Sequence, residues 1–196
     1  LVFGRRAGAG AVDYVKQSQA VKVSDTSIKN AAERIAAPFK RSGGENPYTL
    51  HQELQEITHN LVGIIRTKTE LAEAINKIAD IRKRIENVSV QGGRIFNPGF
   101  HLSFDLDNML LVAESTAKSA IVREESRGGH TRDDFPVMNT KWRGLNNISS
   151  FNGKEVVVKQ QELPFMPKEL FSLFDVHELE KYMSQEEIDN ILEGVK

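Results

Sequence analysis

The chain has 196 residues, and its 26 Lys and Arg residues nearly balance its 27 Asp and Glu residues, for a formal net charge of −1. Because the two signs of charge are interspersed, the sequence excludes a basic surface for nucleic acid. The absence of cysteine excludes disulfides, thiolate metal sites and an iron–sulfur cluster held by this chain. No stretch approaches the ~18 consecutive apolar residues of a membrane-spanning helix, so we expect no direct membrane insertion.

The first segment, residues 1–18, is rich in small residues and is predicted to form a helix that packs closely on another backbone. Its Gly8-Ala9-Gly10 does not complete a dinucleotide-binding fingerprint, because Asp13 stands where the third glycine is required. The chain starts at Leu1 without an initiator methionine. We therefore expect it to be a fragment of a longer protein.

A further helix is predicted to start at Ser24 or Asp25, with one of these side chains as its N-cap. Pro38 is expected to end or kink this helix, because proline lacks the backbone N–H that a helix interior needs. Its predicted buried stripe consists of Ile28, Ala31, Ala32 and Ile35. Residues 41–44 are then expected to form a loop.

Two long helices joined by a short connection are predicted next. Asn46 and Pro47 are typical of an N-cap followed by proline at the first helical position, and Thr67 with Glu70 forms a capping box. Apolar residues recur at helical spacing in both segments: Leu50, Leu54, Ile57, Leu61 and Ile64, then Leu71, Ile75, Ile78, Ile81, Ile85 and Val88. So short a connection predicts an antiparallel helical hairpin.

Glycines and a proline in residues 89–100 predict a break, and another long helix is expected from about Ser103 to Arg127. Gly128 is the predicted terminating residue, because glycine is favoured just after the end of a helix. The predicted buried stripe consists of Leu106, Leu110, Ala113, Ala117 and Ala120.

The C-terminal third changes in composition. Asn152-Gly153 lies between two β-prone stretches and predicts a hairpin with a type I′ turn. Pro164 and Pro167 bracket an apolar cluster formed by Phe165, Met166, Leu170, Phe171, Leu173 and Phe174. A last short helix is predicted after the capping box of Ser184 and Glu187.

These elements together predict a mainly α fold. We expect an antiparallel three- to four-helix bundle, spectrin-repeat-like, with an irregular C-terminal tail that contains a short β-hairpin. The chain is divided into residues 1–22, a terminal helix; residues 23–130, the helical bundle domain; and residues 131–196, the tail with the hairpin and short helices.

Histidines at positions 51, 59, 101, 130 and 177 are the candidate metal ligands. His51 and His59 lie two turns apart and ~80° around a helix axis, so they cannot share a metal. His101 and Asp105 form an i, i+4 pair, which favours capping or solvation over a metal site. The neighbouring carboxylates in the sequence do not form an acid/base pair. We therefore predict no catalytic, cofactor-binding or metal-binding residue in this chain.

The segment from Arg123 to Pro136 concentrates charge, glycine and histidine at the predicted end of the long helix. Two interpretations stay open. The segment is either a solvent-exposed helix end, or a corner where guanidinium groups meet carboxylates of an adjacent domain.

Residues 125–136, ESRGGHTRDDFP, resemble the C-terminal motif of succinate dehydrogenase and fumarate reductase flavoprotein subunits. Three further pieces follow the order of that family. Residues 1–9 resemble the end of its flavin domain, residues 54–71 its second helix, and residues 96–130 its long helix. The resemblance covers residues 1 to 143, and the tail beyond matches only loosely.

The resemblance implies a parent subunit of electron transport and the tricarboxylic acid cycle, which carries FAD and interconverts succinate and fumarate by hydride transfer. Its partners would be an iron–sulfur subunit and a quinone-reactive membrane anchor. The flavin-binding, catalytic and substrate-binding residues would precede Leu1, so we expect the fragment itself to be structural, inactive and without FAD. Residues 1–22 would be a remnant of the flavin-binding domain. The expected location is cytoplasmic, peripheral at the inner face of the plasma membrane through partner subunits.

The resemblance and the charge pattern together give a hypothesis for Arg127, His130 and Arg132. We expect these residues to form hydrogen bonds and ion pairs across the boundary with the upstream flavin domain. Two alternatives stay open. The chain resembles the helical domains of L-aspartate oxidase and adenylylsulfate reductase, although residues 131–134 favour the dicarboxylate dehydrogenases. The second alternative is a non-enzymatic helical interaction module, which the exposed apolar cluster over residues 165–174 suggests.

Overall fold

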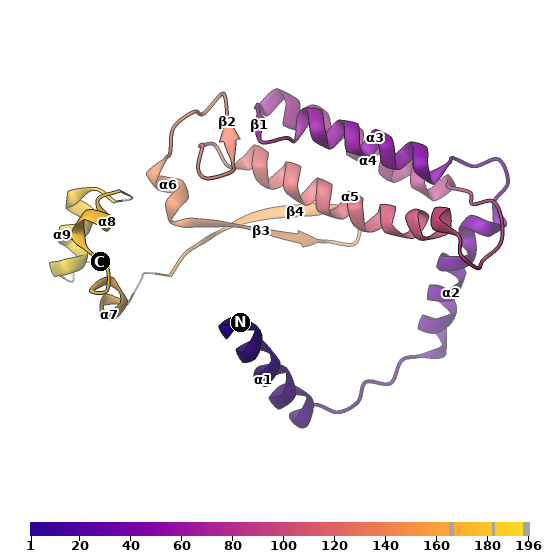
Figure 1. The fold of residues 1–196 in the computed structure, drawn as a ribbon, viewed down its shortest axis with the longest axis horizontal. Coiled ribbons are helices and arrows are strands. Elements are labelled where there is room, and N and C mark those ends of the chain that lie inside the picture. The colour runs from indigo at the N-terminus through magenta and orange to yellow at the C-terminus, as the bar shows by residue number, and fades with distance from the viewer. Residues whose placement is uncertain (165–166, 182, 194–196) are drawn as a thin grey trace.

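The computed structural model describes residues 1–164, 167–181 and 183–193 (Figure 1). The long helices are α1 (Val2–Gln17), α2 (Asp25–Lys40), α3 (Pro47–Leu61), α4 (Lys68–Arg84), which continues into the 3-10 turn η1 (Ile85–Asn87), and α5 (Pro98–Val122). The short helices are α6 (Thr140–Arg143), α7 (Lys168–Phe171), α8 (Val176–Leu179) and α9 (Gln185–Glu193). The strands are β1 (Ile65–Arg66), β2 (Thr131–Arg132), β3 (Leu145–Phe151) and β4 (Val156–Glu162). The prediction of a mainly helical fold with a β-hairpin is confirmed.

Helices α3, α4 and α5 pack side by side and bury the predicted apolar stripes between them (Figure 1). The fully buried residues of this core are Leu50, Leu71, Ala74, Ile78, Ile81, Leu106, Leu110 and Ala117. Ile64 was expected in the stripe of α3, but it follows the end of that helix and is 71% exposed. Burial of each large apolar side chain contributes about 1.5–3 kcal/mol, so this shared core accounts for the association of the three helices.

The predicted N-caps of α3 and α4 are confirmed. The Asn46 side-chain oxygen accepts a hydrogen bond from the backbone N–H of Tyr48 at 2.9 Å. At the next helix, the backbone N–H of Thr67 donates to Glu70 Oε2 at 2.8 Å, and the N–H of Glu70 donates to Thr67 Oγ1 at 3.3 Å. Both caps satisfy backbone donors that the first turn of a helix leaves without partners.

Helices α1 and α2 extend away from the bundle (Figure 1). Ser24 caps α2 as predicted, by accepting from the backbone N–H of Ser27 at 3.2 Å. Pro38 was expected to end or kink this helix, and it does not end it, since α2 continues to Lys40. The expected burial of its stripe and of residues 1–18 is also not found, because no residue of either helix is buried by the described part of the chain.

Helix α5 starts and ends about five residues earlier than predicted. It begins at Pro98 because Asn97 is its N-cap, with Asn97 Oδ1 accepting from the backbone N–H of Phe100 at 3.0 Å. It ends at Val122, where the next residue already has an extended backbone. Gly128 is therefore not the terminating residue. With φ of +59° it instead occupies a turn that follows the helix.

Strands β3 and β4 form the predicted hairpin, in antiparallel register from Leu145 opposite Glu162 to Phe151 opposite Val156. The predicted type I′ turn is wrong, because four residues rather than two separate the strands. Only Gly153 in this loop has a positive φ, of +93°. The Asn152 side-chain oxygen accepts from the backbone N–H groups of the third and fourth loop residues, both at 2.9 Å, and so stabilises the longer loop.

A buried carboxylate fixes the hairpin against the bundle. Glu114 of α5 is only 7% exposed, and it pairs with Arg82 of α4 at 2.7 Å and with Lys118 at 2.8 Å. The backbone N–H of Val156, at the start of β4, donates to Glu114 Oε1 at 3.2 Å. Lys118 Nζ donates to the carbonyl oxygen of the same strand residue at 2.7 Å. One carboxylate thus connects α4, α5 and the hairpin.

The C-terminal helices have a small core of their own, formed by Phe171, Leu179 and Ile188. The predicted capping box of α9 is confirmed, with the backbone N–H of Ser184 donating to Glu187 Oε2 at 2.8 Å and the N–H of Glu187 donating to Ser184 Oγ. Two members of the predicted apolar cluster, Phe165 and Met166, lie outside the described residues. The remaining members besides Phe171 are exposed: Leu170, Leu173 and Phe174.

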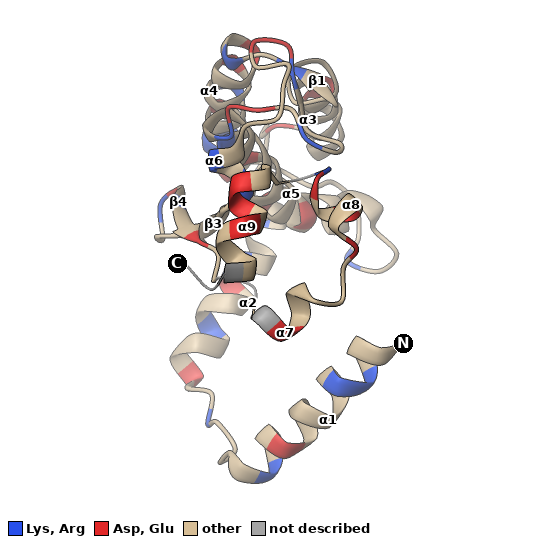
Figure 2. Cartoon of the chain, turned by 90° about the vertical axis from the view of Figure 1, so that its left-hand side faces the viewer, with Lys and Arg blue, Asp and Glu red and all other residues tan. Residues whose placement is uncertain are grey.

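Both signs of charge occur along α1, α2, α4 and α5, as the sequence predicted, whereas α3, α8 and α9 carry Asp or Glu but no Lys or Arg among the described residues (Figure 2). No helix in the described ranges is both long and apolar enough to cross a membrane.

Candidate functional site

The segment that follows α5 folds into a compact group of charged residues, which we call the arginine corner: residues 123–134 together with Arg66 of β1. Its centre is Glu125, whose side chain is fully buried. The guanidinium of Arg123 donates to Glu125 Oε1 at 2.5 and 2.9 Å, and that of Arg127 donates to both carboxylate oxygens at 3.0 and 3.1 Å. The backbone N–H of Asn139 completes the shell at 2.9 Å.

These contacts hold Glu125 in its ionised form. Burial alone would raise the pKa of this carboxyl group, but hydrogen bonds from Arg127, the Asn139 amide and Arg123 lower the pKa to about 2. They also explain the end of α5. Arg123 must leave the helical conformation for its own side chain to reach Glu125 and the chain beyond it.

Arg132 caps the C-terminal end of α5 with a side chain that lies inside the fold. Its side chain is fully buried, and Nη1 donates to the carbonyl oxygens of Ala120 and Ile121 at 3.0 and 3.1 Å. These are carbonyls that the last turn of a helix leaves without backbone donors. The Nε and Nη2 atoms of Arg132 bind Asp134 at 2.8 and 2.7 Å, and this hydrogen-bonded pair lowers the pKa of Asp134 to about 2.

His130 is half-buried in a tight turn. Its backbone N–H and C=O exchange hydrogen bonds with Arg127 at 3.1 and 2.8 Å, and its ring Nε2 lies 2.9 Å from the Arg123 carbonyl oxygen. Burial lowers the pKa of His130, and the neighbouring charges of Arg66, Arg123 and Arg132 lower it further, against the effect of the carbonyl contact. A neutral imidazole fits this site as an N–H donor to Arg123.

The structure thus brings the three predicted interface residues, Arg127, His130 and Arg132, into one corner. It also adds a residue that the sequence analysis did not single out. Arg66 lies in β1, which pairs in parallel with β2, so that Arg66 is opposite Arg132. The sequence signal was present, because a single arginine ends the apolar run from Leu61 to Ile65, directly before the Thr67 cap.

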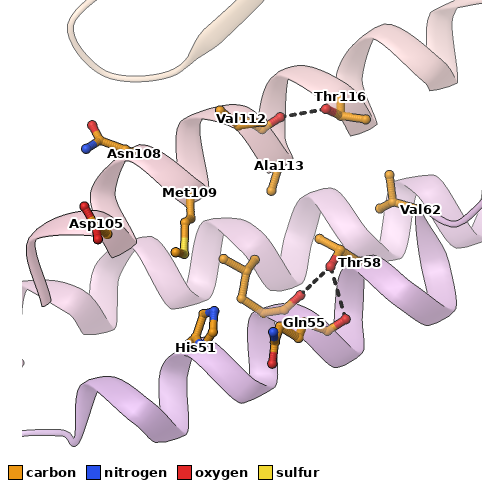
Figure 3. A pocket seen from close by; sticks show the side chains of 11 residues that line it. His51, Gln55, Thr58, Val62, Asp105, Asn108, Met109, Val112, Ala113 and Thr116 are labelled. Carbon is orange, nitrogen blue, oxygen red and sulfur yellow. Dashed lines mark hydrogen bonds between the residues drawn. The ribbon is translucent and has the colours of Figure 1, made fainter. Parts of the chain in front are cut away.

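A groove of about 600 Å³ runs between α3 and α5 (Figure 3). Side chains from the two helices line it: His51, Leu54, Gln55, Thr58 and Val62, with Asp105, Asn108, Met109, Val112, Ala113 and Thr116. Its two threonine hydroxyls donate to carbonyl oxygens of their own helices, Thr58 to Leu54 at 2.9 Å and Thr116 to Val112 at 2.8 Å. The groove is therefore mainly apolar, with a few polar groups along it.

The groove between α3 and α5 does not fit a flavin dinucleotide. A pyrophosphate group needs a cation or a glycine-rich loop that presents backbone N–H groups, and the groove has neither among its lining residues. Gly8 and Gly10 lie inside helix α1 rather than in a loop. In the part of the chain that the structure describes, no three His, Asp or Glu residues are placed to share a metal ion.

Comparison with known proteins places this architecture in a family. The model of the family described as fumarate reductase flavoprotein C-term matches residues 51–170. The chain belongs to this family. Its members are FAD-dependent flavoproteins, and the matched part of this fumarate reductase flavoprotein C-terminal region includes the bundle, the arginine corner and the hairpin.

Among curated relatives, an uncharacterized FAD-dependent oxidoreductase of Methanocaldococcus jannaschii is 36% identical over 73% of this chain and 25% of its own length. A succinate dehydrogenase flavoprotein subunit of Rickettsia bellii is 29% identical over 89% of this chain and 29% of its own length. The chain thus spans about a quarter of the length of these relatives.

A solved structure resembles almost the whole chain. The Mycobacterium smegmatis Sdh1 complex in the apo form superimposes with a TM-score of 0.88 and 46% identity, over 96% of this chain and 33% of the solved one. The adenylylsulfate reductase of Archaeoglobus fulgidus superimposes with a TM-score of 0.70 at 17% identity, over 84% of this chain and 28% of that one. The latter likeness shows a shared fold and nothing finer.

Proposed function

We propose that this chain is the C-terminal helical part of a flavoprotein subunit that interconverts succinate and fumarate. The observation that supports this function best is the likeness to the Sdh1 complex over 96% of the chain at 46% identity. In the complete protein, FAD would accept or supply the hydride, and an iron–sulfur subunit and a membrane anchor would connect the flavin to quinone. That subunit would be cytoplasmic and peripheral, held at the inner face of the plasma membrane by its partners.

Within such a subunit, we assign this chain a structural role and no step of the reaction. The division into residues 1–22 as the end of the flavin-binding domain, residues 23–130 as a bundle of spectrin-repeat type, and residues 131–196 as the tail is part of the proposal. The exposed apolar side chains of α1 and α2, such as Val15, Ile28 and Ile35, support it, because apolar helix faces of this kind require a covering surface.

The arginine corner is the proposed contact with the flavin-binding domain. Arg127 is the best placed of the predicted residues to reach across, since its side chain is 26% exposed. Arg132 is fully buried, so it would act by holding the shape of the corner. His130 would contribute in the same way through its hydrogen bond to the Arg123 carbonyl.

The test is Arg127→Ala in the full-length flavoprotein subunit. We expect lower flavin content, weaker assembly with the iron–sulfur subunit and slower succinate-dependent dye reduction than in the wild type. Arg94→Ala is the matched control, because Arg94 is an exposed arginine of the loop before α5 and its guanidinium lies over the ring of Phe39, away from the arginine corner. Wild-type values for all three measurements in Arg127→Ala would contradict the interface.

The 196-residue chain offers a second test. Purified alone, it should lack flavin absorbance and should not reduce a dye in the presence of succinate. Reduction of adenylylsulfate by the full-length subunit, with no succinate activity, would instead favour the adenylylsulfate reductase alternative. A stable complex with an unrelated protein, together with a gene that encodes no flavin domain, would favour an interaction module.

A further inference from the structure

Arg66 is a buried cation without an acidic partner. Arg66 is only 9% exposed, and its Nε atom is buried with no hydrogen-bond partner among the described residues. One Nη atom reaches the carbonyl oxygen of Gly129 at 3.5 Å, which is longer than a well-formed hydrogen bond. No ion pair among the described residues includes Arg66.

Three carboxylates of this part of the fold are already engaged. Glu125 accepts from two other arginines and a backbone N–H. Asp134 accepts from Arg132 and from the backbone N–H of Lys68. Glu70 is used in the capping box of α4. None of these three groups is therefore free to neutralise Arg66. Asp133 donates its backbone N–H to the Arg66 carbonyl oxygen at 3.1 Å, but its side chain is exposed and forms no ion pair among the described residues.

The formal charges of the corner balance, since its four guanidinium groups, those of Arg66, Arg123, Arg127 and Arg132, stand against four carboxylates. Among the described residues, however, the ion pairs of the corner use only Glu125 and Asp134, and none of them includes Arg66. Arginine keeps its proton under all ordinary conditions, so Arg66 cannot relieve its burial by becoming neutral. Burial, and then the charge of Arg132, lower the pKa of Arg66, which is the direction expected for a cation that lacks a counter-charge.

The surface beside Arg66 is apolar. The two residues before it, Ile64 and Ile65, are 71% and 65% exposed. Their backbone is held in place by β1–β2 pairing and by the hydrogen bond from Thr131 N–H to the Ile64 carbonyl at 3.3 Å. A small anion would neutralise Arg66 but leave these side chains in water. A protein surface would cover both features at once.

We propose that Arg66 binds an aspartate or glutamate side chain of the protein surface that covers the corner. This proposal rests on the function proposed above, in which that surface belongs to the flavin-binding region of the same subunit. The guanidinium offers an Nη atom to this carboxylate, since its Nε is buried and is not accessible from outside the chain. Ile64 and Ile65 pack against apolar side chains of the same surface. The contact is thus a desolvated ion pair with an apolar rim.

A structure of the assembled full-length subunit tests the proposal directly. We expect a carboxylate oxygen from outside these 196 residues within hydrogen-bond distance of an Nη atom of Arg66. An Asp or Glu of this chain there, or only water or an inorganic anion, would overturn it.

Variants then measure the contact. In the full-length subunit, Arg66→Met should speed limited proteolysis at the boundary between the two regions by at least about tenfold, because one charge of a buried pair loses its partner. Arg66→Lys should restore part of the protection, and the exposed control Arg94→Met should behave as the wild type. Replacing the partner acid by its amide should add little to Arg66→Met, since both changes remove the same pair.

Sodium sulfate distinguishes a free anion from a side chain. Sulfate stabilises folded proteins in general, so at equal ionic strength any extra protection from proteolysis by sulfate over chloride should be the same in the wild type and in Arg66→Met. Stronger protection by sulfate that is lost in Arg66→Met would show an inorganic anion site and overturn the assignment of a protein carboxylate. Wild-type proteolysis of Arg66→Met, together with flavin loss in Arg127→Ala, would refute only the Arg66 contact. Wild-type behaviour of both variants would refute the proposed interface itself.

Discussion

Glu125→Gln is expected to destabilise the chain strongly. The substitution keeps the shape of the side chain but removes the charge on which Arg123, Arg127 and the Asn139 amide converge. The glutamine amide group also places two donors where the carboxylate only accepted hydrogen bonds. Both guanidinium groups then lose their counter-charge in a buried site.

The pKa of Glu125 gives the magnitude. The pKa is about 2 in the fold against 4.5 for the ordinary group, a difference that corresponds to roughly 3–4 kcal/mol. Because the pKa is depressed, this stabilisation is complete above about pH 4.5 and is lost as the pH falls toward 2. Glu125→Gln should therefore lower the free energy of unfolding by roughly 3–4 kcal/mol at pH 7 and by much less at pH 2.5.

Urea unfolding followed by circular dichroism measures both effects. Glu124→Gln is the matched control, because Glu124 is the exposed neighbour of Glu125, and it should change the free energy of unfolding by less than about 0.5 kcal/mol. A Glu125→Gln variant within 0.5 kcal/mol of the wild type at pH 7 would refute the role of this carboxylate. So would an equal loss at both pH values.

Three further changes test the bundle by the same urea measurement. Glu114→Gln should cost about 2–3 kcal/mol and speed amide exchange in the hairpin, whereas Asp107→Gln on the exposed side of α5 should do neither. Leu110→Ala should cost about 2–5 kcal/mol, because Leu110 is fully buried; equal losses in the 67% exposed Val112→Ala would contradict the assigned core. Thr67→Ala should cost about 1 kcal/mol through loss of the capping box, and no loss would mean that the cap does not hold α4.

Local signals predicted the parts of the fold that local contacts form. Asn46 before Pro47 and Thr67 before Glu70 fixed the starts of α3 and α4, and the structure has both caps. The same signal was present at Asn97 and Pro98, but the glycines around it favoured a loop, so the start of α5 was placed too late. A cap is thus recognisable from sequence even where neighbouring residues favour a break.

Long-range contacts decided what the sequence could not predict. Helix α5 ends at Val122 because Glu125 collects donors that include the backbone of Asn139, and no local pattern shows this. The buried state of Arg132 and the exposed state of Ile28 likewise depend on which surfaces meet in the fold. The sequence therefore placed the candidate interface residues in one segment, and only the pairing of β1 with β2 added Arg66 to them.

The position of α5 among its neighbours has a consequence for synthesis on the ribosome. Helices α3 and α4 precede α5 in the chain and the hairpin follows it, yet all of them pack on α5. A nascent chain that ends before α5 leaves the fully buried Leu50, Leu71 and Ile78 without their third layer. The pair of helices α3 and α4 should therefore remain without a complete core, and accessible to chaperones, until α5 has left the exit tunnel.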